Sequence, residues 1–107
     1  MSEVPEIQAV DVPAEVFLLD VREPNEWVAG HAVGAVHIPM YQVPARLDEL
    51  PDADIVVICK SGGRSAAVTE FLLAQGRAAV NLAGGTTAWQ AAGRPMAAEN
   101  GSEPFVL

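Results

Sequence analysis

Cysteine is nearly absent from this chain, whose 107 residues include only one, Cys59. A lone cysteine cannot form an internal disulfide, and a free thiol persists best in a reducing compartment, so we expect a cytoplasmic protein. Protein zinc sites need several cysteine or histidine ligands at characteristic spacings. With one cysteine and two histidines, His31 and His37, at no such spacing, we expect no metal site.

Basic residues and long apolar runs are also scarce. Lysine and arginine number 6 against 14 acidic residues, which gives a formal net charge of -8. Nucleic-acid binding needs clustered basic residues that neutralise phosphates, so we expect no nucleic-acid partner. No stretch is long and apolar enough to span a bilayer, and the first six residues lack the basic and apolar regions of a signal peptide. We therefore expect no membrane association.

What the chain does contain is a large apolar fraction, since 50% of its residues are hydrophobic. A chain of this length and composition can bury one core, so we expect a single domain over residues 1–107. Its body should cover about 7–96, and 97–107 should form a partly mobile tail whose last residues dock on that body. No apolar interface is evident in the sequence, which favours a monomer.

Short apolar runs alternate with helical segments along the chain. The run Ile55-Val56-Val57-Ile58 is β-branched without alternation, as expected of a strand covered on both faces. The connections are too long for hairpins, which predicts right-handed crossovers and an α/β fold with a mainly parallel sheet flanked by helices. We expect strands at 7–10, 17–21, 36–38, 55–58 and 79–82, and helical segments at 23–30, 41–50, 66–75 and 84–93.

Cys59 occupies a position suited to chemistry, because it directly follows the clearest strand and precedes the clearest helix. Ligands bind at the carboxyl ends of strands in such sheets; Cys59 lies at one such end, and Asp20 lies near another. Backbone N–H groups of a glycine-containing loop and the following helix N-terminus favour an anion. If they lower the thiol pKa by ~1–3 units, they stabilise the thiolate by roughly 1.4–4 kcal/mol. We expect an ionised sulfur that is open to solvent.

The other loop residues fit this interpretation. Gly62 and Gly63 permit positive φ angles or a close backbone approach, although an ordinary turn is the alternative. Lys60 is the only lysine of the chain, and with Arg64 it places positive charge beside the sulfur of an acidic protein.

Three further segments accompany this loop, 59–65 (CKSGGRS). In chain order they are 19–27 (LDVREPNEW), 30–39 (GHAVGAVHIP), and Gly84-Gly85 with Trp89 and Gly93-Arg94-Pro95. In these segments the chain resembles the rhodanese family of sulfurtransferases over about 7–96. The resemblance implies an α/β domain with a central parallel sheet of about five strands.

The resemblance implies a two-step transfer of sulfane sulfur of the thiosulfate sulfurtransferase type. The Cys59 thiolate takes the outer sulfur of a small anionic donor such as thiosulfate and becomes a persulfide. Cyanide, a small thiol or a protein thiol then removes that sulfur. Thiol exchange of this kind needs no cofactor, and the N–H groups from Lys60 to Ser65 would hold the negative sulfur.

The resemblance leaves several residue roles open. Lys60 should attract the donor, and Arg64 should either do the same or bind a carboxylate that braces the loop. Ser61 is either a hydrogen-bond donor to sulfur or a turn residue. Ser65 either caps the helix, which is the preferred interpretation, or contacts the substrate. Asp20 and Arg22 either orient the loop or form a buried brace, which is the preferred interpretation. His31 and His37 are likewise expected to be braces, and Trp27 and Trp89 to be packing residues.

Three other functions compete with this interpretation. Phosphatases and arsenate reductases of similar architecture place five residues between cysteine and arginine, whereas four separate Cys59 from Arg64 here. The shorter loop encloses a smaller volume, suited to one sulfur atom. A binding module without catalysis would typically lack the loop cysteine. A persulfide carrier that hands sulfur to a biosynthetic enzyme would share the same chemistry, and the sequence cannot separate it from an independent enzyme.

Overall fold

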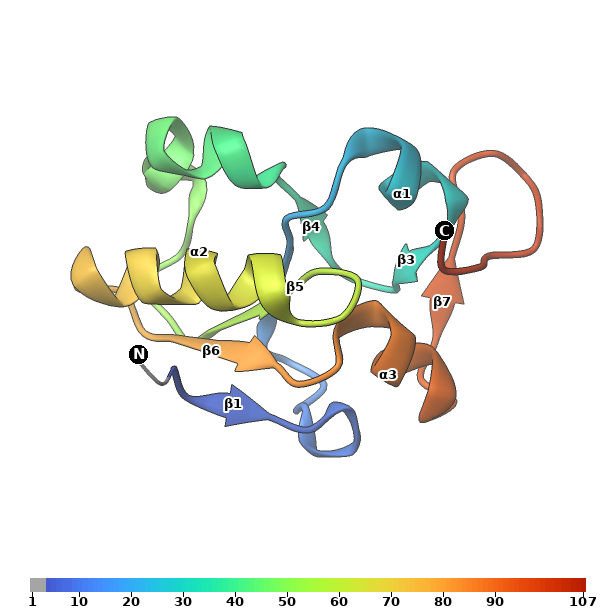
Figure 1. The fold of residues 1–107 in the computed structure, drawn as a ribbon, viewed down its shortest axis with the longest axis horizontal. Helices are drawn as coiled ribbons and strands as arrows, with labels where there is room; N and C mark the ends of the chain where they lie inside the picture. The colour runs from blue at the N-terminus through green and yellow to red at the C-terminus, as the bar shows by residue number, and fades with distance from the viewer. Residues whose placement is uncertain (1–3) are drawn as a thin grey trace.

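The structure, a computed structural model, describes residues 4–107. It is an α/β domain in which short strands alternate with helices (Figure 1). The strands are β1 (Glu6–Ile7), β2 (Phe17–Asp20), β3 (His31–Ala32), β4 (Val36–His37), β5 (Ile55–Ile58), β6 (Ala79–Leu82) and β7 (Met96–Ala97). The α-helices are α1 (Pro24–Ala29), α2 (Gly63–Ala74) and α3 (Gly85–Ala91), and the 3-10 segments are η1 (Ala9–Asp11) and η2 (Met40–Glu49).

The main sheet has five strands in the order β1-β6-β5-β2-β4, and every neighbouring pair is parallel. This confirms the predicted fold class and the five-stranded parallel sheet. The small strands β3 and β7 form a separate antiparallel pair. Since β5 lies at the centre of the main sheet, the residue that follows it lies at the middle of the sheet's carboxyl edge.

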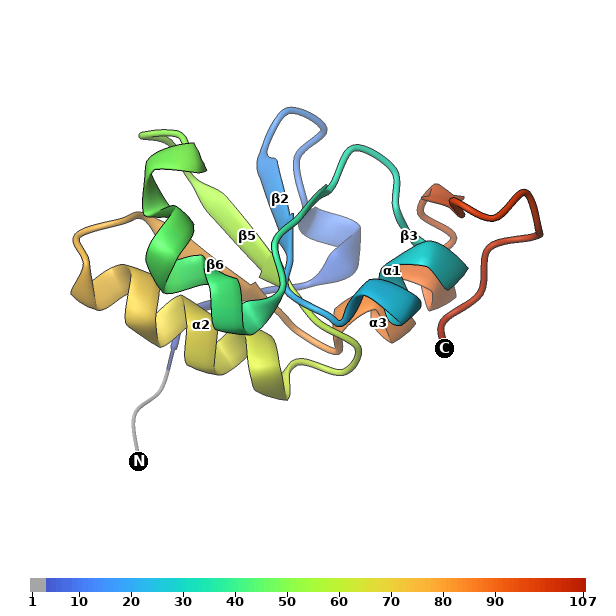
Figure 2. The ribbon, with the colours of Figure 1, turned by 90° about the horizontal axis from the view of Figure 1, so that it is seen from above.

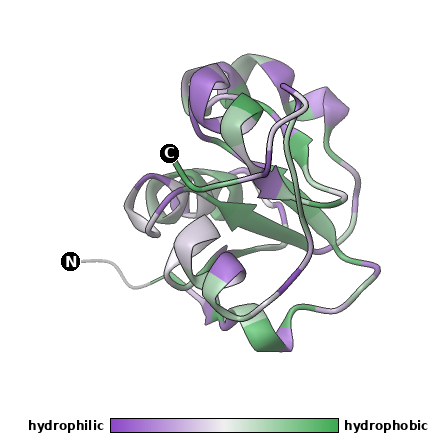
Figure 3. Ribbon diagram, turned by 90° about the vertical axis from the view of Figure 1, so that its right-hand side faces the viewer, coloured by the Kyte–Doolittle hydropathy of each residue, from purple (hydrophilic) through white to green (hydrophobic). Residues whose placement is uncertain are grey.

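Both faces of the sheet are covered, as the continuous apolar run of β5 predicts (Figure 2). Helix α2 and η2 pack on one face, where the core includes Val57, Val68 and Leu72. Segment η1 and helix α3 pack on the other face, where Ile58 and Trp89 belong to a second core cluster. Figure 3 shows the hydrophobic colours concentrated on the central strands.

The predicted strand at 7–10 is wrong beyond its first residue. The strand is Glu6–Ile7, and the chain then turns into the 3-10 segment Ala9–Asp11. The turn brings the small side chain of Ala9 into the core and leaves Val10 70% exposed. The expected helix start near Ser65 is also late, because α2 begins at Gly63.

The end of the chain packs on the body, as expected. The N–H of Phe105 donates to the carbonyl of Ala29 at 3.1 Å, and the N–H of Glu99 donates to the carbonyl of Val28 at 3.0 Å. Gly30 ends α1 where this segment passes, and a Cβ there would lie 2.4 Å from the Phe105 carbonyl oxygen. Within the described part of the chain, no helix is long and apolar enough to cross a membrane.

Candidate active site

Cys59 follows β5 directly, and its side chain faces α2. Successive side chains of a strand point to opposite faces, so Cys59 joins Ile55 and Val57 in the core cluster under that helix. The residue is 1% exposed. The expectation of a sulfur open to solvent is therefore wrong for this conformation, because the loop and the first turn of α2 enclose it.

Two hydrogen-bond donors converge on the Cys59 sulfur. The N–H of Gly62 lies 3.1 Å from Sγ, and the hydroxyl of Ser65 lies 3.2 Å from it. Burial raises the pKa of the thiol, but hydrogen bonds from Ser65, Gly62 and Ser61 outweigh that effect and lower the pKa below its ordinary value. The loop therefore stabilises a thiolate even though the sulfur is buried.

The first turn of α2 explains the positions of these donors. Gly62 is the N-cap with a φ of 112°, a left-handed conformation that glycine adopts without steric cost. Gly63 is the first helical residue, where nothing requires a positive φ. Ser65 is the third helical residue and not the cap, so its expected capping role is wrong. Its hydroxyl instead faces Cys59 and Asn81.

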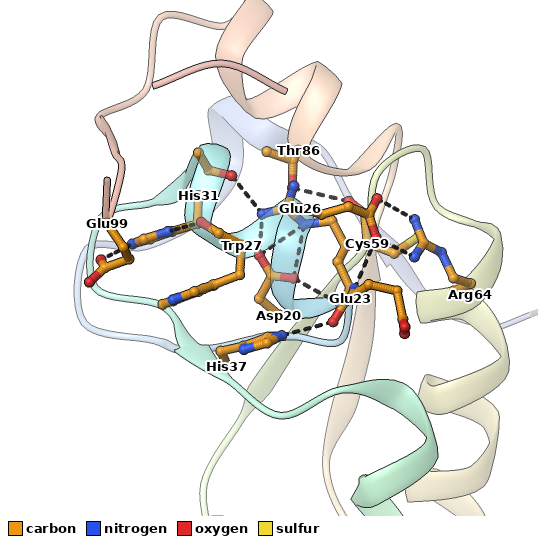
Figure 4. A network of polar contacts seen from close by, with 12 residues as sticks. Asp20, Glu23, Glu26, Trp27, His31, His37, Cys59, Arg64, Thr86 and Glu99 are labelled. Carbon is orange, nitrogen blue, oxygen red and sulfur yellow. Dashed lines mark hydrogen bonds and ion pairs between the residues drawn. The ribbon is translucent and has the colours of Figure 1, made fainter. Parts of the chain in front are cut away.

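The start of α3 holds the carbonyl side of the same loop. The N–H and hydroxyl of Thr86 donate to the Cys59 carbonyl at 2.8 Å and 3.1 Å (Figure 4). The N–H of Thr87 donates to the Lys60 carbonyl at 3.1 Å. Gly85 permits this approach, because a Cβ there would lie 2.4 Å from the Cys59 carbonyl oxygen. With these carbonyls held by α3, the loop N–H groups are left to turn toward the sulfur.

Asn81, on the neighbouring strand β6, joins two residues of the loop, Gly62 and Ser65, to Glu6 of β1. Its Oδ1 accepts the Ser65 hydroxyl, and its Nδ2 donates to the Gly62 carbonyl at 3.1 Å and to a carboxylate oxygen of Glu6 at 3.0 Å. Asn81 is 1% exposed. A single buried amide thus contacts both residues that donate to Sγ.

Arg64 binds a carboxylate. Its guanidinium makes a bidentate ion pair with Glu26 of α1, at 2.7 Å and 2.9 Å (Figure 4). The hydrogen bonds from Arg64 hold the pKa of Glu26 down at about 2, against the opposing effect of burial. Of the two roles left open for Arg64, this conformation shows the brace, which ties the active-site loop to α1.

Asp20 and Arg22 form a buried pair, which agrees with the preferred interpretation of these residues as a brace. Nε and Nη2 of Arg22 donate to the two carboxylate oxygens of Asp20 at 2.7–3.1 Å, and Nη2 also donates to the Gly30 carbonyl at 2.7 Å. Both residues are fully buried. The pair therefore fixes the chain that leads from β2 into α1, and with it the position of Glu26.

The two histidines stack on Trp27 rather than meeting at a metal site. The Trp27 ring lies between His31, at a centroid distance of 3.5 Å, and His37, at 4.9 Å (Figure 4). His31 also pairs with Glu99, and His37 contacts the Arg22 carbonyl. Among residues 4–107, no group of three or more potential ligands is placed to hold a metal ion.

Lys60 and Ser61 lie at the outer side of the loop, where both are exposed. They are the parts of the loop that a ligand arriving from solvent meets first. The structure thus brings residues 59–65 together around one sulfur. It places Asp20 at the end of the adjacent strand β2, where its partner Arg22 contacts the Gly30 carbonyl at the end of α1.

Sequence reasoning missed four residues that shape this site: Glu26, Asn81, Gly85 and Thr86. Glu26 and Gly85 lie in segments that carried the resemblance, but nothing local to them indicates a contact with the loop. Asn81 gave one usable signal, a polar residue within an otherwise apolar strand, since a buried amide needs hydrogen-bond partners.

Comparison with known proteins agrees with this architecture. The family model described as a rhodanese-like domain matches residues 6–92. A protein named sulfurtransferase from Allochromatium vinosum is 40% identical over 89 residues, which cover 81% of this chain and 83% of that protein. Thiosulfate sulfurtransferase 16, chloroplastic, of Arabidopsis thaliana is 35% identical over 116 residues, covering 91% of this chain and 97% of that protein.

A solved structure shows the same fold. The crystal structure of a rhodanese-related protein from Thermoplasma volcanium superimposes with a TM-score of 0.81 at 34% identity. The match covers 87% of this chain and 97% of that one.

Proposed function

Because the chain belongs to the rhodanese family, we propose that it transfers sulfane sulfur from a small anionic donor to a thiophilic acceptor through a persulfide on Cys59. The observation that carries the proposal is the pair of donors on Sγ, the Gly62 N–H and the Ser65 hydroxyl. They lower the pKa of a thiol that burial alone would keep protonated.

Thiosulfate is the donor we propose. The thiolate of Cys59 attacks the outer sulfur and forms a new S–S bond, while the S–S bond of thiosulfate breaks and sulfite leaves with the electron pair. The acceptor then attacks the outer sulfur of the persulfide, and Cys59 leaves as a thiolate. The Arabidopsis relative is named a thiosulfate sulfurtransferase, which supports thiosulfate as the donor.

The loop residues have distinct roles in this scheme. The N–H groups around Sγ stabilise its negative charge in the resting thiolate and again when the thiolate leaves the persulfide. Exposed Lys60 attracts the anionic donor to the loop. Arg64 braces the loop through Glu26, and the Asp20–Arg22 pair holds the end of α1 through the Gly30 carbonyl.

Burial of the sulfur adds a step before chemistry. Cys59 is 1% exposed, so the donor reaches Sγ only after the outer part of the loop moves aside. Lys60, Ser61 and Gly63 are exposed, whereas the Cys59 and Lys60 carbonyls are held by α3. We propose that the Ser61 end of the loop opens while the α3 contacts remain.

Intact-mass spectrometry tests the central claim. The wild-type protein treated with thiosulfate should gain the mass of one sulfur atom, and cyanide should remove it. Cys59→Ser is the control, and it should neither gain mass nor release sulfite. Donor turnover by this variant would refute the mechanism.

A side-by-side assay with thiosulfate, 3-mercaptopyruvate and an aryl phosphate tests the reaction class and the donor together. Turnover of the aryl phosphate alone would favour a phosphatase. Inserting a glycine between Gly62 and Gly63 gives the loop the phosphatase length, and any phosphatase activity gained would support the size argument. If thiosulfate adds a sulfur to Cys59 but neither cyanide nor a dithiol removes it, the result would favour a persulfide carrier whose acceptor is a protein thiol.

A further inference from the structure

Asn81 lies beside the sulfur without touching it, and its amide orientation is determined by its partners. Nδ2 lies within hydrogen-bond distance of a Glu6 carboxylate oxygen and of the Gly62 carbonyl oxygen. Both of those atoms only accept hydrogen bonds, so the amide nitrogen must face them. The amide oxygen therefore faces Ser65 and acts there as an acceptor.

Ser65 consequently has two acceptors for one proton. Its Oγ lies 3.2 Å from the Cys59 sulfur and 2.5 Å from Asn81 Oδ1, and a serine hydroxyl carries a single hydrogen. When Cys59 is a thiol, S–H can donate to Oγ while the hydroxyl donates to Asn81. When Cys59 is a thiolate, the hydroxyl best satisfies the sulfur, and Oδ1 then loses its donor.

We propose that Asn81 is a positioning residue that competes with the Cys59 sulfur for the hydroxyl proton of Ser65, and so limits how readily Cys59 ionises. The proposal rests on the proposed function in so far as the thiolate is the nucleophile. In this proposal a residue of β6 affects the ionisation of the Cys59 sulfur without contacting the substrate.

The competition has a physical cost on the thiolate side. Asn81 is 1% exposed, so solvent does not reach its amide to replace the donor that Oδ1 loses. A buried acceptor left without a donor is unfavourable, and this penalty falls only on the ionised state of Cys59. Removing the acceptor should therefore favour ionisation, provided that the loop keeps its shape.

Other charges near the sulfur stay constant when Asn81 is changed to an uncharged residue. Glu6 faces Asn81 from β1, and Arg64, paired with Glu26, lies beside the loop on α2. Exposed Lys60 belongs to the loop itself. Glu23 precedes α1 and acts on Arg64 electrostatically. Asp20 ends β2, on the far side of β5 from β6, and pairs there with the buried Arg22.

Ultraviolet titration of the thiolate measures the effect directly, because Cys59 is the only thiol in the chain. We expect Asn81→Leu to shift the ionisation midpoint of Cys59 down by about half to one pH unit, the size that one hydrogen bond supports. Ser65→Ala should shift it up, because the sulfur loses its hydroxyl donor. In the Ser65→Ala background, Asn81→Leu should cause no shift.

Thr69→Val is the matched control. Thr69 is buried on α2 and its hydroxyl donates to the Ser65 carbonyl, so the change removes a polar contact beside Ser65 without altering the hydroxyl of Ser65 itself. We expect its Cys59 midpoint to equal that of the wild type. Asn81→Ala serves as a second variant if the leucine variant does not fold, as judged by circular dichroism.

An upward shift in Asn81→Leu or Asn81→Ala would overturn the proposal, because it would show that Asn81 only anchors the donors. An equal downward shift with and without the Ser65 hydroxyl would overturn it as well. The titration uses no sulfur donor, so it is separate from the proposed function. If the ionisation midpoints of Cys59 shift as expected but thiosulfate adds no mass to the protein, the competition for the Ser65 proton would be supported and the sulfur transfer refuted.

Discussion

The ion pair between Glu26 and Arg64 gives the sharpest quantitative prediction. Glu26→Gln keeps the size of the side chain but removes the charge that receives both Arg64 nitrogens. The pair joins α1 to the active-site loop across 38 residues of sequence. We therefore expect the variant to be less stable and its loop less firmly held.

The magnitude follows from the carboxylate. Folding lowers the pKa of Glu26 from 4.5 to about 2, chiefly through the hydrogen bonds from Arg64. That difference corresponds to about 3 kcal/mol at neutral pH. The Arg64 side chain is 36% exposed, and solvent screens such pairs, so we expect about 1–2 kcal/mol.

The pH dependence identifies the cause. Because the folded pKa is the lower one, the stabilisation is complete above about pH 4.5 and is lost as the pH falls toward 2. Urea unfolding of the wild type and Glu26→Gln at pH 7, 5, 4 and 3 measures the difference. We expect the difference in the free energy of unfolding between the wild type and the variant to be the same at pH 7 and 5 and smaller at pH 4 and 3.

Glu49→Gln is the matched control, since Glu49 makes a similar bidentate contact with Arg46 on the exposed η2. Neither group is buried, so we expect little change in stability. The reasoning fails if the two variants lose equal stability, or if the Glu26→Gln gap stays the same down to pH 3.

Three further predictions concern the loop. Gly85→Ala should cost about 2–4 kcal/mol of stability, because Gly85 has a positive φ and a Cβ there would clash with the Cys59 carbonyl. Gly93→Ala, also at positive φ but with open space around it, should cost about 1–2 kcal/mol. Equal losses of stability in thermal unfolding would contradict this prediction. Lys60→Ala should raise KM for thiosulfate roughly fivefold at low salt with little change in kcat. A lower kcat with an unchanged KM would show that Lys60 does not act by attracting the anionic donor. The alkylation rate of Cys59 should rise with pH around a midpoint below that of free cysteine, because hydrogen bonds from the loop lower the pKa of Cys59. A midpoint equal to that of free cysteine would show that the loop does not stabilise the thiolate.

The parts of the fold that follow from local pattern were predictable. The apolar run at 55–58 indicates a strand covered on both faces, and β5 lies at the centre of the sheet. The edge strand β1 was not predictable in length, because Ala9 and Val10 continue its apolar pattern while the chain turns. Nothing in those two residues reveals that one is buried and the other exposed.

The candidate site divides in the same way. Residues 59–65 are contiguous, so spacing alone places the sulfur, the glycines and the arginine in one loop. The contacts that shape the loop come from far along the chain, with Thr86 27 residues from Cys59 and Asn81 19 residues from Gly62. Such pairings depend on the strand order, in which β6 lies next to β5, and one sequence does not specify that order.

Access to the sulfur and stabilisation of its charge oppose each other in this structure. The groups that lower the pKa of Cys59 belong to the same loop and helix turn that leave it 1% exposed. Opening the whole loop would remove the donors and return the thiol to its protonated form. We therefore propose that a productive opening moves the exposed outer residues while α3 and Asn81 hold the carbonyl side. In the proposed transfer, the contacts from these neighbouring elements keep the donors on the sulfur as well as stabilise the fold.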